Sequence, residues 1–238
     1  MKVIILAGGL GTRISEETSK RPKPMVEING KPILWHIMGI YASQGYKDFI
    51  IATGYKGNVI NDWVKSLNND WNISAIDTGL ETQTGGRIAH CLSEYPSESS
   101  FMMTYGDGLG NIDISNLLRS HKESGKMVTL TAVHPPARFG YLQISSEDNL
   151  VEEFSEKNQT NEGWINGGFF VINKEVTKYI AAKKSSFEIE SLPNIARARQ
   201  LNAYKHEDFW KPMDTLREKN ELETLSKLAK VPWMNDRV

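Results

Sequence analysis

Short apolar runs in the chain are separated by longer stretches in which apolar residues recur every three or four positions. The short runs are rich in β-branched and aromatic residues, which is typical of buried strands, whereas the longer stretches have the spacing of amphipathic helices. The predicted strands cover residues 3–7, 48–52, 71–76, 100–105 and 127–133. The predicted helices begin at Pro32, cover 59–67, begin near Gly86, and run from Asp113 to Ser124. This alternation predicts an α/β fold with a parallel sheet.

The pattern changes after residue 133, where two prolines interrupt it and short strands follow without long helices between them. Those strands are expected at 141–144, 150–154, 165–172 and 201–206, ahead of a closing helix with a leucine stripe. We therefore expect a Rossmann-like, mostly parallel (mixed) sheet with helices on both faces and a small β-rich substructure. The chain would form a single domain, 1–238, with a core at 1–133, a β-rich part at 134–205 and a closing segment at 206–238.

A glycine-rich loop follows the first strand. Gly8, Gly9 and Gly11 stand within four positions, and glycine allows a ligand to approach the main chain closely. Two familiar phosphate loops are excluded by spacing. The Walker pattern does not occur, and the dinucleotide fingerprint fails because Ile14 stands where its third glycine would be. Taken alone, the glycines also fit an ordinary turn after a strand.

Two cations accompany this loop. Arg13 follows the glycines directly, and Lys23 lies between Pro22 and Pro24, which fix the backbone around it. Loop amides with fixed positive charges beside them form a site for an anion, and a phosphate fits best. The alternative for Lys23 is a solvated loop lysine.

Two further polar loops follow predicted strands, at the sheet edge where open α/β folds bind ligands. Residues 77–87 contain the pair Gly85-Gly86, and their hydroxyls and amides could contact the edge of a flat base. The other interpretation is a capping loop with Thr84 as the helix N-cap. Asp107 stands between two glycines, where its carboxylate could bind a metal or simply satisfy a turn.

Composition narrows the classes of function. The net charge is −1 and no basic block occurs, which argues against nucleic acid as the main partner. The single cysteine, Cys91, lies in an apolar helical pattern and is expected to pack in the core of a protein from a reducing compartment. No stretch is long enough to span a bilayer, and the first apolar run ends at Ala7, too early for a secretion signal. We therefore expect a cytoplasmic protein without a membrane partner.

Several motifs occur in a specific order along the chain. They are Leu6–Arg13, Lys20–Met25, Asp77–Gly79, Thr84–Arg87, Tyr105–Gly108, Ala137–Gly140, Asn166–Phe170 and Phe209–Arg217. This order resembles the sugar-1-phosphate nucleotidyltransferases over nearly the whole chain. Within that family it is most similar to members that use CTP and glucose 1-phosphate. One departure is the segment 58–76, which is shorter than in those members.

The resemblance implies an enzyme that forms CDP-glucose and pyrophosphate with Mg²⁺, for polysaccharide synthesis of the deoxysugar or O-antigen type. By the same resemblance the catalytic residues are Arg13, Lys23 and Asp107, and the metal ligands are Asp107 and Asp214. The implied nucleotide-binding residues are Leu6, Ala7, Gly8, Gly9, Leu10, Gly11, Thr12, Arg13, Lys23, Thr82, Gly86, Arg87 and Gly106. The implied sugar-phosphate-binding residues are Gly140, Tyr141, Glu156, Lys157, Asn166 and Gly167.

The implied reaction needs fixed positive charge more than a strong base. A phosphate monoester is already anionic at neutral pH, so the main obstacle is repulsion between two polyanions that must be held in line. Arg13 and Lys23 could neutralise the β and γ phosphates, and Lys157 could bring in the sugar phosphate. Mg²⁺ is commonly held by one or two carboxylates together with phosphates, which suits Asp107 and Asp214.

Three alternatives stay open. The base could be thymine, uracil or guanine, and the sugar phosphate could be that of another hexose or a heptose. The chain could also be a catalytically idle nucleotide-binding subunit built on the same fold. A homo-oligomer is expected, and Trp233 could pack on its own chain or on a neighbouring one.

Overall fold

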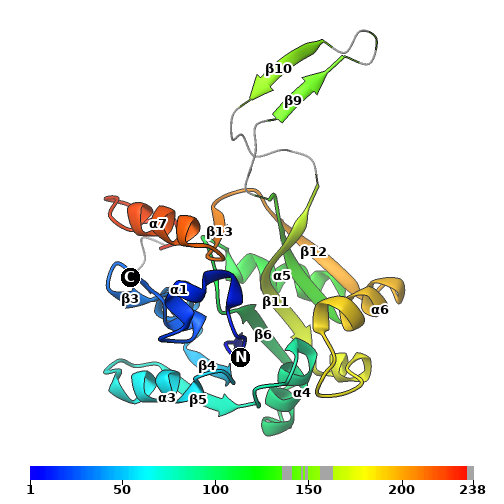
Figure 1. Ribbon diagram of the computed structural model, residues 1–238. Helices are drawn as coiled ribbons and strands as arrows, with labels where there is room; N and C mark the ends of the chain where they lie inside the picture. The colour runs from blue at the N-terminus through cyan, green and yellow to red at the C-terminus, as the bar shows by residue number, and fades with distance from the viewer. Residues whose placement is uncertain (136–140, 146, 148–149, 156–162, 235–238) are drawn as a thin grey trace.

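A computed structural model of the chain describes residues 1–135, 141–145, 147, 150–155 and 163–234 (Figure 1). Its centre is a seven-stranded mixed sheet in the order β12-β8-β11-β6-β1-β4-β5. The strands are β1 (Val3–Leu6), β4 (Asp48–Thr53), β5 (Asn72–Asp77), β6 (Ser100–Tyr105), β8 (Val128–Val133), β11 (Ile165–Asn173) and β12 (Leu201–His206). Only β11 runs antiparallel to its neighbours β6 and β8 in this sheet. The expected mostly parallel, mixed α/β sheet is confirmed.

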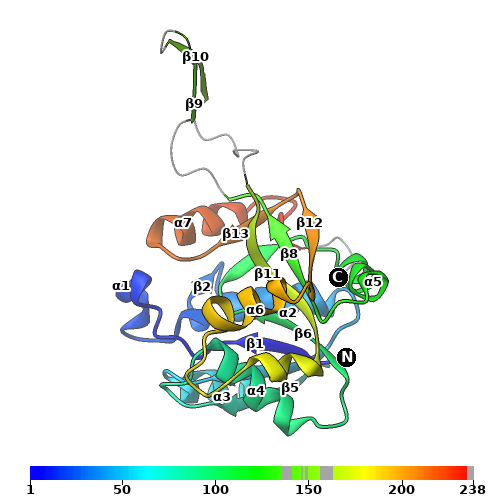
Figure 2. The ribbon, with the colours of Figure 1, turned by 90° about the vertical axis from the view of Figure 1, so that its right-hand side faces the viewer.

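Helices cover both faces of the sheet (Figure 2). Alternate residues of β1 belong to different cores: Val3 and Ile5 pack on one face, and Ile4 and Leu6 pack on the other. The first face is covered by α2 (Ile33–Ala42), α3 (Gly57–Ser66), α5 (Ile114–Ser124) and α7 (Leu216–Leu225). The second is covered by α4 (Thr84–Glu94) and α6 (Leu192–Arg197). Because β1 is buried on both faces, its sequence is a continuous apolar run and not an alternation of apolar and polar residues.

The smaller elements lie around this sheet. They are α1 (Ser15–Thr18), the paired β2 (Glu27–Ile28) and β3 (Lys31–Pro32), the paired β7 (Gly108–Gly110) and β13 (Trp210–Pro212), and a hairpin of β9 (Tyr141–Ile144) and β10 (Val151–Ser155). The hairpin stands clear of the central sheet in both ribbon views. By contrast, β11 and β12, which we expected in the β-rich part, pair with β6 and β8 inside the central sheet.

Two local expectations about helix ends meet different outcomes. Asp113 caps α5 by accepting a hydrogen bond from the Asn116 backbone, and Gly125 ends the helix with a φ of 61°, so this helix has the predicted bounds. The alternative interpretation of residues 77–87, with Thr84 as the N-cap of α4, is wrong. The N-cap is Gln83, because the Thr84 hydroxyl is used elsewhere: it donates to Glu188 and accepts from the Phe187 backbone.

Strand register brings the candidate residues to one sheet edge. Leu6 is opposite Tyr105 in the parallel pair β1–β6, so the loops that follow both strands leave the sheet side by side. Pairing of β7 with β13 sets Gly108 opposite Pro212, and the Met213 backbone donates to the Asp107 carbonyl. Asp107 and Asp214 therefore meet although more than 100 residues separate them.

Trp233 packs on its own chain. It is 1% exposed, its ring lies against His36 and Phe209, and its Nε1 donates to His36 Nδ1. No helix in the described ranges combines the length and hydropathy that crossing a bilayer requires.

Candidate active site

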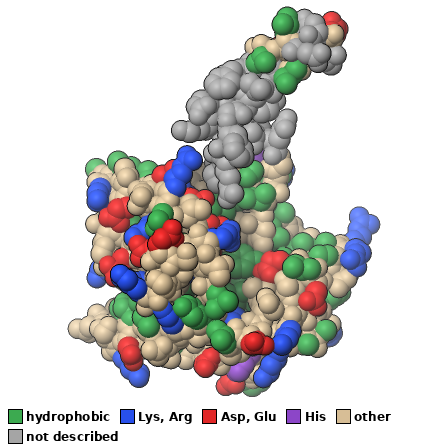
Figure 3. All heavy atoms as spheres, viewed as in Figure 1, with side chains coloured by type: hydrophobic (Ala, Val, Ile, Leu, Met, Phe, Trp, Pro, Cys, Tyr) green, Lys and Arg blue, Asp and Glu red, His purple; other side chains and the backbone are tan. Residues whose placement is uncertain are grey.

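A hollow of about 730 Å³ opens at the sheet edge where β1 and β6 end. Its walls come from the glycine loop, the loop before α4 and the end of β6. The lining residues are Leu6, Gly8–Thr12, Leu80–Thr84, Arg87, Tyr105, Gly106, Asp107 and Lys184. A smaller hollow of about 250 Å³ adjoins it and adds Ala7, Arg13, Lys23 and Pro24. Figure 3 shows this face hollowed, with hydrophobic side chains on the floor and acidic and basic side chains along the wall.

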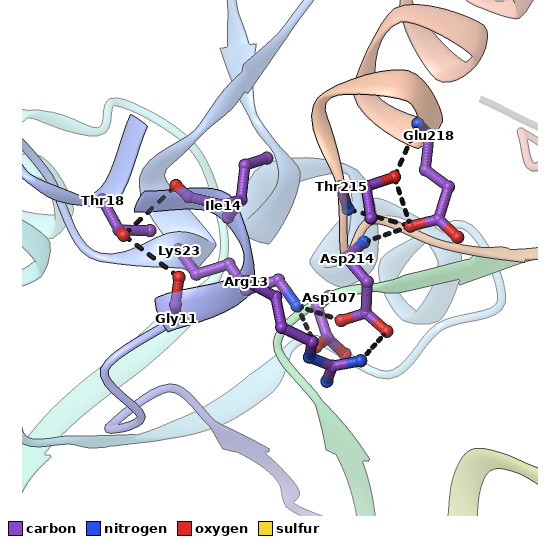
Figure 4. Close-up of polar contacts among 9 residues, drawn as sticks. All are labelled: Gly11, Arg13, Ile14, Thr18, Lys23, Asp107, Asp214, Thr215 and Glu218. Carbon is purple, nitrogen blue, oxygen red and sulfur yellow. Dashed lines mark hydrogen bonds and ion pairs between the residues drawn. The ribbon is translucent and has the colours of Figure 1, made fainter. Parts of the chain in front are cut away.

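Two cations and two carboxylates converge beside these hollows (Figure 4). The Lys23 ammonium donates to Asp107 at 2.7 Å and to Asp214 at 2.6 Å. The Arg13 guanidinium reaches the other oxygen of Asp214 at 2.5 Å. The residues come from the loop after β1, the loop after β6 and the start of α7, so tertiary folding alone brings them together.

Lys23 is a buried charge that its partners keep ionised. It is 8% exposed, and burial by itself would lower its pKa. The charges and hydrogen bonds of Asp107 and Asp214 outweigh that effect and raise the pKa above its ordinary value. The ammonium is therefore fully protonated at neutral pH and is fixed in place. Arg13 differs, because its side chain is 67% exposed and free to reach a ligand from solvent.

The start of α7 positions Asp214. A capping box forms there: the Thr215 hydroxyl accepts from the Glu218 backbone, and the Glu218 carboxylate accepts from the Thr215 backbone. The same carboxylate oxygen also accepts from the Asp214 backbone at 2.7 Å. Asp214 thus immediately precedes a rigid helix start and not a loose loop.

Arg87 forms hydrogen bonds with the backbone of the glycine loop and of the neighbouring strand end. It is 4% exposed and donates to the carbonyls of Gly8 and Thr53 and to the Thr78 hydroxyl. Burial lowers its pKa, which the charge of nearby Asp77 partly offsets. A Cβ on Gly8 would lie 2.1 Å from the guanidinium, so glycine is required there for this support. Arg87 lines the larger hollow, but these hydrogen bonds go to the protein itself.

The Gly85-Gly86 pair packs against another segment of the chain. A Cβ on Gly86 would lie 2.1 Å from the Lys183 carbonyl, and one on Gly85 would lie 2.7 Å from the Ser185 carbonyl. The backbone amides of Gln83 and Gly85 donate to those same two carbonyls. Thr82 lines the larger hollow whereas Gly86 does not. The close contact that these two glycines allow is therefore made by the backbone of residues 183–185.

The sugar-phosphate residues predicted from the sequence are only partly described. Asn166 and Gly167 lie where the β11–β8 register shifts, and the Gly167 carbonyl accepts from Trp210 Nε1 at 2.8 Å. Tyr141 begins β9, and its side chain is outside the described residues. Gly140, Glu156 and Lys157 also lie outside the described residues.

Some residues at the hollow were not predicted from the sequence. Tyr105 and Thr84 line its wall, and both donate to Glu188. Lys184 lines the rim and pairs with Glu81 at 3.0 Å. The position of Tyr105 before Gly106-Asp107 was a usable signal, because it ends a strand at the ligand-binding edge. Glu188 carried none, since it lies about 80 residues further along the chain.

The carboxylate pair is chemically suited to a divalent cation. Asp107 and Asp214 already share one cationic group, the Lys23 ammonium, so their oxygens converge on a common point. In the part of the chain that the structure describes, no group of three or more His, Cys, Asp or Glu residues forms a complete metal site. Two carboxylates with room for phosphate oxygens and water match the coordination that Mg²⁺ prefers.

Comparison with known proteins supports a nucleotide-using site. A family model described as "Nucleotidyl transferase" matches residues 2–217. A glucose-1-phosphate cytidylyltransferase of Salmonella typhi is 44% identical over 255 residues, covering 98% of this chain and 98% of that protein. A probable glucose-1-phosphate cytidylyltransferase of Bacillus subtilis is 38% identical and covers 98% of this chain and 99% of its own. The crystal structure of HddC from Yersinia pseudotuberculosis complexed with GMP-PN has a TM-score of 0.73 and 26% identity, covering 95% of this chain and 99% of that one.

Proposed function

Because the chain belongs to the nucleotidyl transferase family, we propose that it joins CTP to α-D-glucose 1-phosphate, giving CDP-glucose and pyrophosphate. The observation that carries the proposal is the gathering of Arg13, Lys23, Asp107 and Asp214 beside the glycine loop. The choice of substrates is supported by full-length similarity to proteins of that activity at 44% and 38% identity.

In the proposed reaction a phosphate oxygen of glucose 1-phosphate attacks the α-phosphorus of CTP, and pyrophosphate leaves. The amides of Gly8 to Thr12 bind the triphosphate, while Arg13 and Lys23 stabilise the charge that grows on the leaving group. The sugar phosphate carries its own negative charge, so no side chain has to remove a proton from it. The protein's contribution is to hold the two anions in line.

Asp107 and Asp214 are the residues that would hold a divalent ion, and we propose Mg²⁺. When bound, the ion would supply positive charge to phosphate oxygens, the chemistry that nucleotide substrates commonly require. In the structure both carboxylates are engaged by Lys23 and one by Arg13. A divalent ion held by these two carboxylates would take over part of their negative charge, and Lys23 and Arg13 could then pair with the triphosphate.

On the sugar side we propose Asn166 and Gly167 as contacts, together with Gly140, Tyr141, Glu156 and Lys157. Thr82 and Gly106 are proposed as contacts on the nucleotide side. Arg87 would act there by holding the Gly8 carbonyl, and Gly86 by letting the start of α4 pack against Lys183. The proposal also includes a homo-oligomer, a cytoplasmic location consistent with the buried free thiol of Cys91, and CDP-glucose as a precursor of deoxysugars in O-antigen-type polysaccharides.

The experiment is a matrix of nucleoside triphosphates against sugar 1-phosphates, with pyrophosphate release as the readout. CTP with glucose 1-phosphate should give the highest kcat/KM. A different winning pair would place the chain elsewhere in the same family, a possibility raised by the GMP-PN complex of the Yersinia protein. Tight nucleotide binding with no pyrophosphate release from any pair would instead indicate a catalytically idle subunit.

A further inference from the structure

Glu188 is a half-buried carboxylate whose partners are all hydroxyl groups. It lies in the π-helical turn Phe187–Ser191. One oxygen accepts from the Tyr105 hydroxyl at 2.8 Å. The other accepts from the Thr84 hydroxyl at 2.5 Å and from the Ser186 hydroxyl at 3.1 Å. Among the described residues no Lys or Arg forms an ion pair with it, so these hydroxyls satisfy its charge.

The chain of hydrogen bonds continues toward the sugar side. The Asn166 Nδ2 group donates to the Tyr105 hydroxyl at 3.0 Å, and the Asn166 Oδ1 atom accepts from the Gly168 backbone. A carboxylate can only accept, so the Tyr105 hydroxyl is the donor in its hydrogen bond to Glu188. Because that proton is committed, the hydroxyl can only accept from Asn166.

Glu188 therefore contacts the hollow indirectly, through two residues that line it. Tyr105 and Thr84 line it, whereas Glu188 does not. Thr84 is the first residue of α4 and lies two positions after Thr82, which is proposed for the nucleotide side. Asn166 belongs to the proposed sugar site. A single carboxylate thus connects Thr84, which lines the hollow, to Asn166 of the proposed sugar site through the Tyr105 hydroxyl.

We propose that Glu188 is a positioning residue that orients Asn166, through Tyr105, toward the sugar phosphate and holds Thr84 on the nucleotide side. The proposal rests on the proposed function, since it concerns the same two substrates. A carboxylate accepts hydrogen bonds and never donates them, so it imposes one direction on every hydroxyl around it. That direction leaves the second Nδ2 hydrogen of Asn166 to donate to a sugar oxygen.

The test compares variants that change either the charge of the side chain at position 188 or its length. Glu188→Gln keeps one acceptor oxygen, which can still accept from Tyr105 while the amide faces Thr84 and Ser186, so KM for the sugar phosphate should stay within about threefold of wild type. Glu188→Asp keeps the charge but is one methylene shorter. Together with Glu188→Ala, it should raise KM for the sugar phosphate roughly tenfold, the scale of losing a hydrogen bond to a charged group.

Tyr105→Phe isolates the sugar branch of the network. It removes the hydroxyl that links Glu188 to Asn166 and leaves the Glu188–Thr84 hydrogen bond in place. KM for the sugar phosphate should rise while KM for the nucleotide stays near wild type. In the double variant with Glu188→Ala the sugar effect should not add, because both changes break the same chain. Glu190→Gln is the matched control, since the carboxylate of exposed Glu190 accepts from the Ser186 backbone and, among the described residues, hydrogen-bonds to neither Tyr105 nor Thr84.

The substrates for this test are the pair that wild type uses best in the matrix, so a different base or sugar leaves the comparison intact. If wild type uses no pair, the proposed function is wrong, and calorimetric binding of glucose 1-phosphate decides the positioning role. The proposal would be overturned if Glu188→Asp and Tyr105→Phe kept the wild-type KM for the sugar phosphate. It would also be overturned if the effects of Glu188→Ala and Tyr105→Phe on that KM were fully additive in the double variant. If Glu188→Ala fails to fold, those two variants still decide the question.

Discussion

Lys23 is held more tightly than any solvated lysine. Its ammonium lies between two carboxylates at 2.6 and 2.7 Å, and its backbone lies in a short turn bounded by Pro22 and Pro24. The two prolines fix the backbone from which this side chain reaches the site, so the ammonium lies beside the smaller hollow before any substrate binds. It also keeps Asp107 and Asp214 from repelling one another across the site.

Replacing Lys23 by Ala should lower kcat by roughly two orders of magnitude or more, the scale of losing one transition-state donor. Steady-state pyrophosphate release measures the effect, and circular dichroism checks the fold. Lys65→Ala, an exposed lysine on α3, is the control and should keep wild-type turnover. A folded Lys23→Ala protein with the wild-type rate would remove the proposed role.

Arg87 illustrates the limit of residue-level prediction. The family resemblance implied that it binds the nucleotide. The structure instead gives its guanidinium to the carbonyls of Gly8 and Thr53, below the glycine loop. A sequence shows that a cation is near a loop but does not show on which side of the loop it lies. Lys23 was predictable because flanking prolines restrict where its side chain can point.

At the scale of elements, α7 determines where Asp214 lies. Thr215→Ala removes the hydroxyl that accepts from the Glu218 backbone, so the free energy of unfolding should fall by about 1 kcal/mol, as for other N-cap losses. Urea denaturation measures it. Thr224→Ala, in the same helix, is the control, because the Thr224 hydroxyl donates to a carbonyl inside the helix and caps nothing. Equal stability of the two variants would contradict the capping role.

The start of α4 offers a second prediction. Gly86→Ala places a Cβ 2.1 Å from the rigid Lys183 carbonyl, and such overpacking should cost about 1–3 kcal/mol or more. Gly39→Ala, in the middle of α2, meets nothing within 4 Å and should stabilise the protein by about 0.5–1 kcal/mol. Thermal and chemical unfolding of both proteins test this contrast. If both substitutions changed the free energy of unfolding in the same direction, the contact between Gly86 and the Lys183 carbonyl would not be tight.

Periodicity predicted the regular elements well and the irregular ones poorly. The bounds of β6 and the end of α5 at Ser124 follow from apolar runs and caps that are local in the sequence. The π-helical turn at Phe187–Ser191 and α6 have no comparable local pattern. The alternative that made Thr84 the N-cap of α4 is wrong because Thr84 bonds to Phe187 and Glu188, about 100 residues away, and local propensity does not include such partners.

At the scale of the whole molecule, the sheet order explains why the site exists. The neighbouring strands β1 and β6 deliver the glycine loop and Asp107 to one edge, and β13 pairs with β7 to return Asp214 to the same place. Residues 13, 23, 107 and 214 could be proposed together from the order of the motifs. Two of them supply positive charge for phosphates, and the other two supply carboxylates for a divalent ion. Their distances, and the way that Lys23 bridges both carboxylates, depend on pairing between distant strands.

The central claim is that these four residues assemble two phosphorylated substrates for a metal-dependent transfer. The most direct measurement is ³¹P NMR of CTP and glucose 1-phosphate incubated with the wild-type protein and with Asp107→Asn and Asp214→Asn, with and without Mg²⁺. Wild type should form CDP-glucose and pyrophosphate in equal amounts only with Mg²⁺, and each variant should be slower by roughly 100-fold or more. The account would be contradicted if either folded variant formed CDP-glucose at the wild-type rate. It would also be contradicted if the wild-type protein formed CDP-glucose equally fast with and without Mg²⁺.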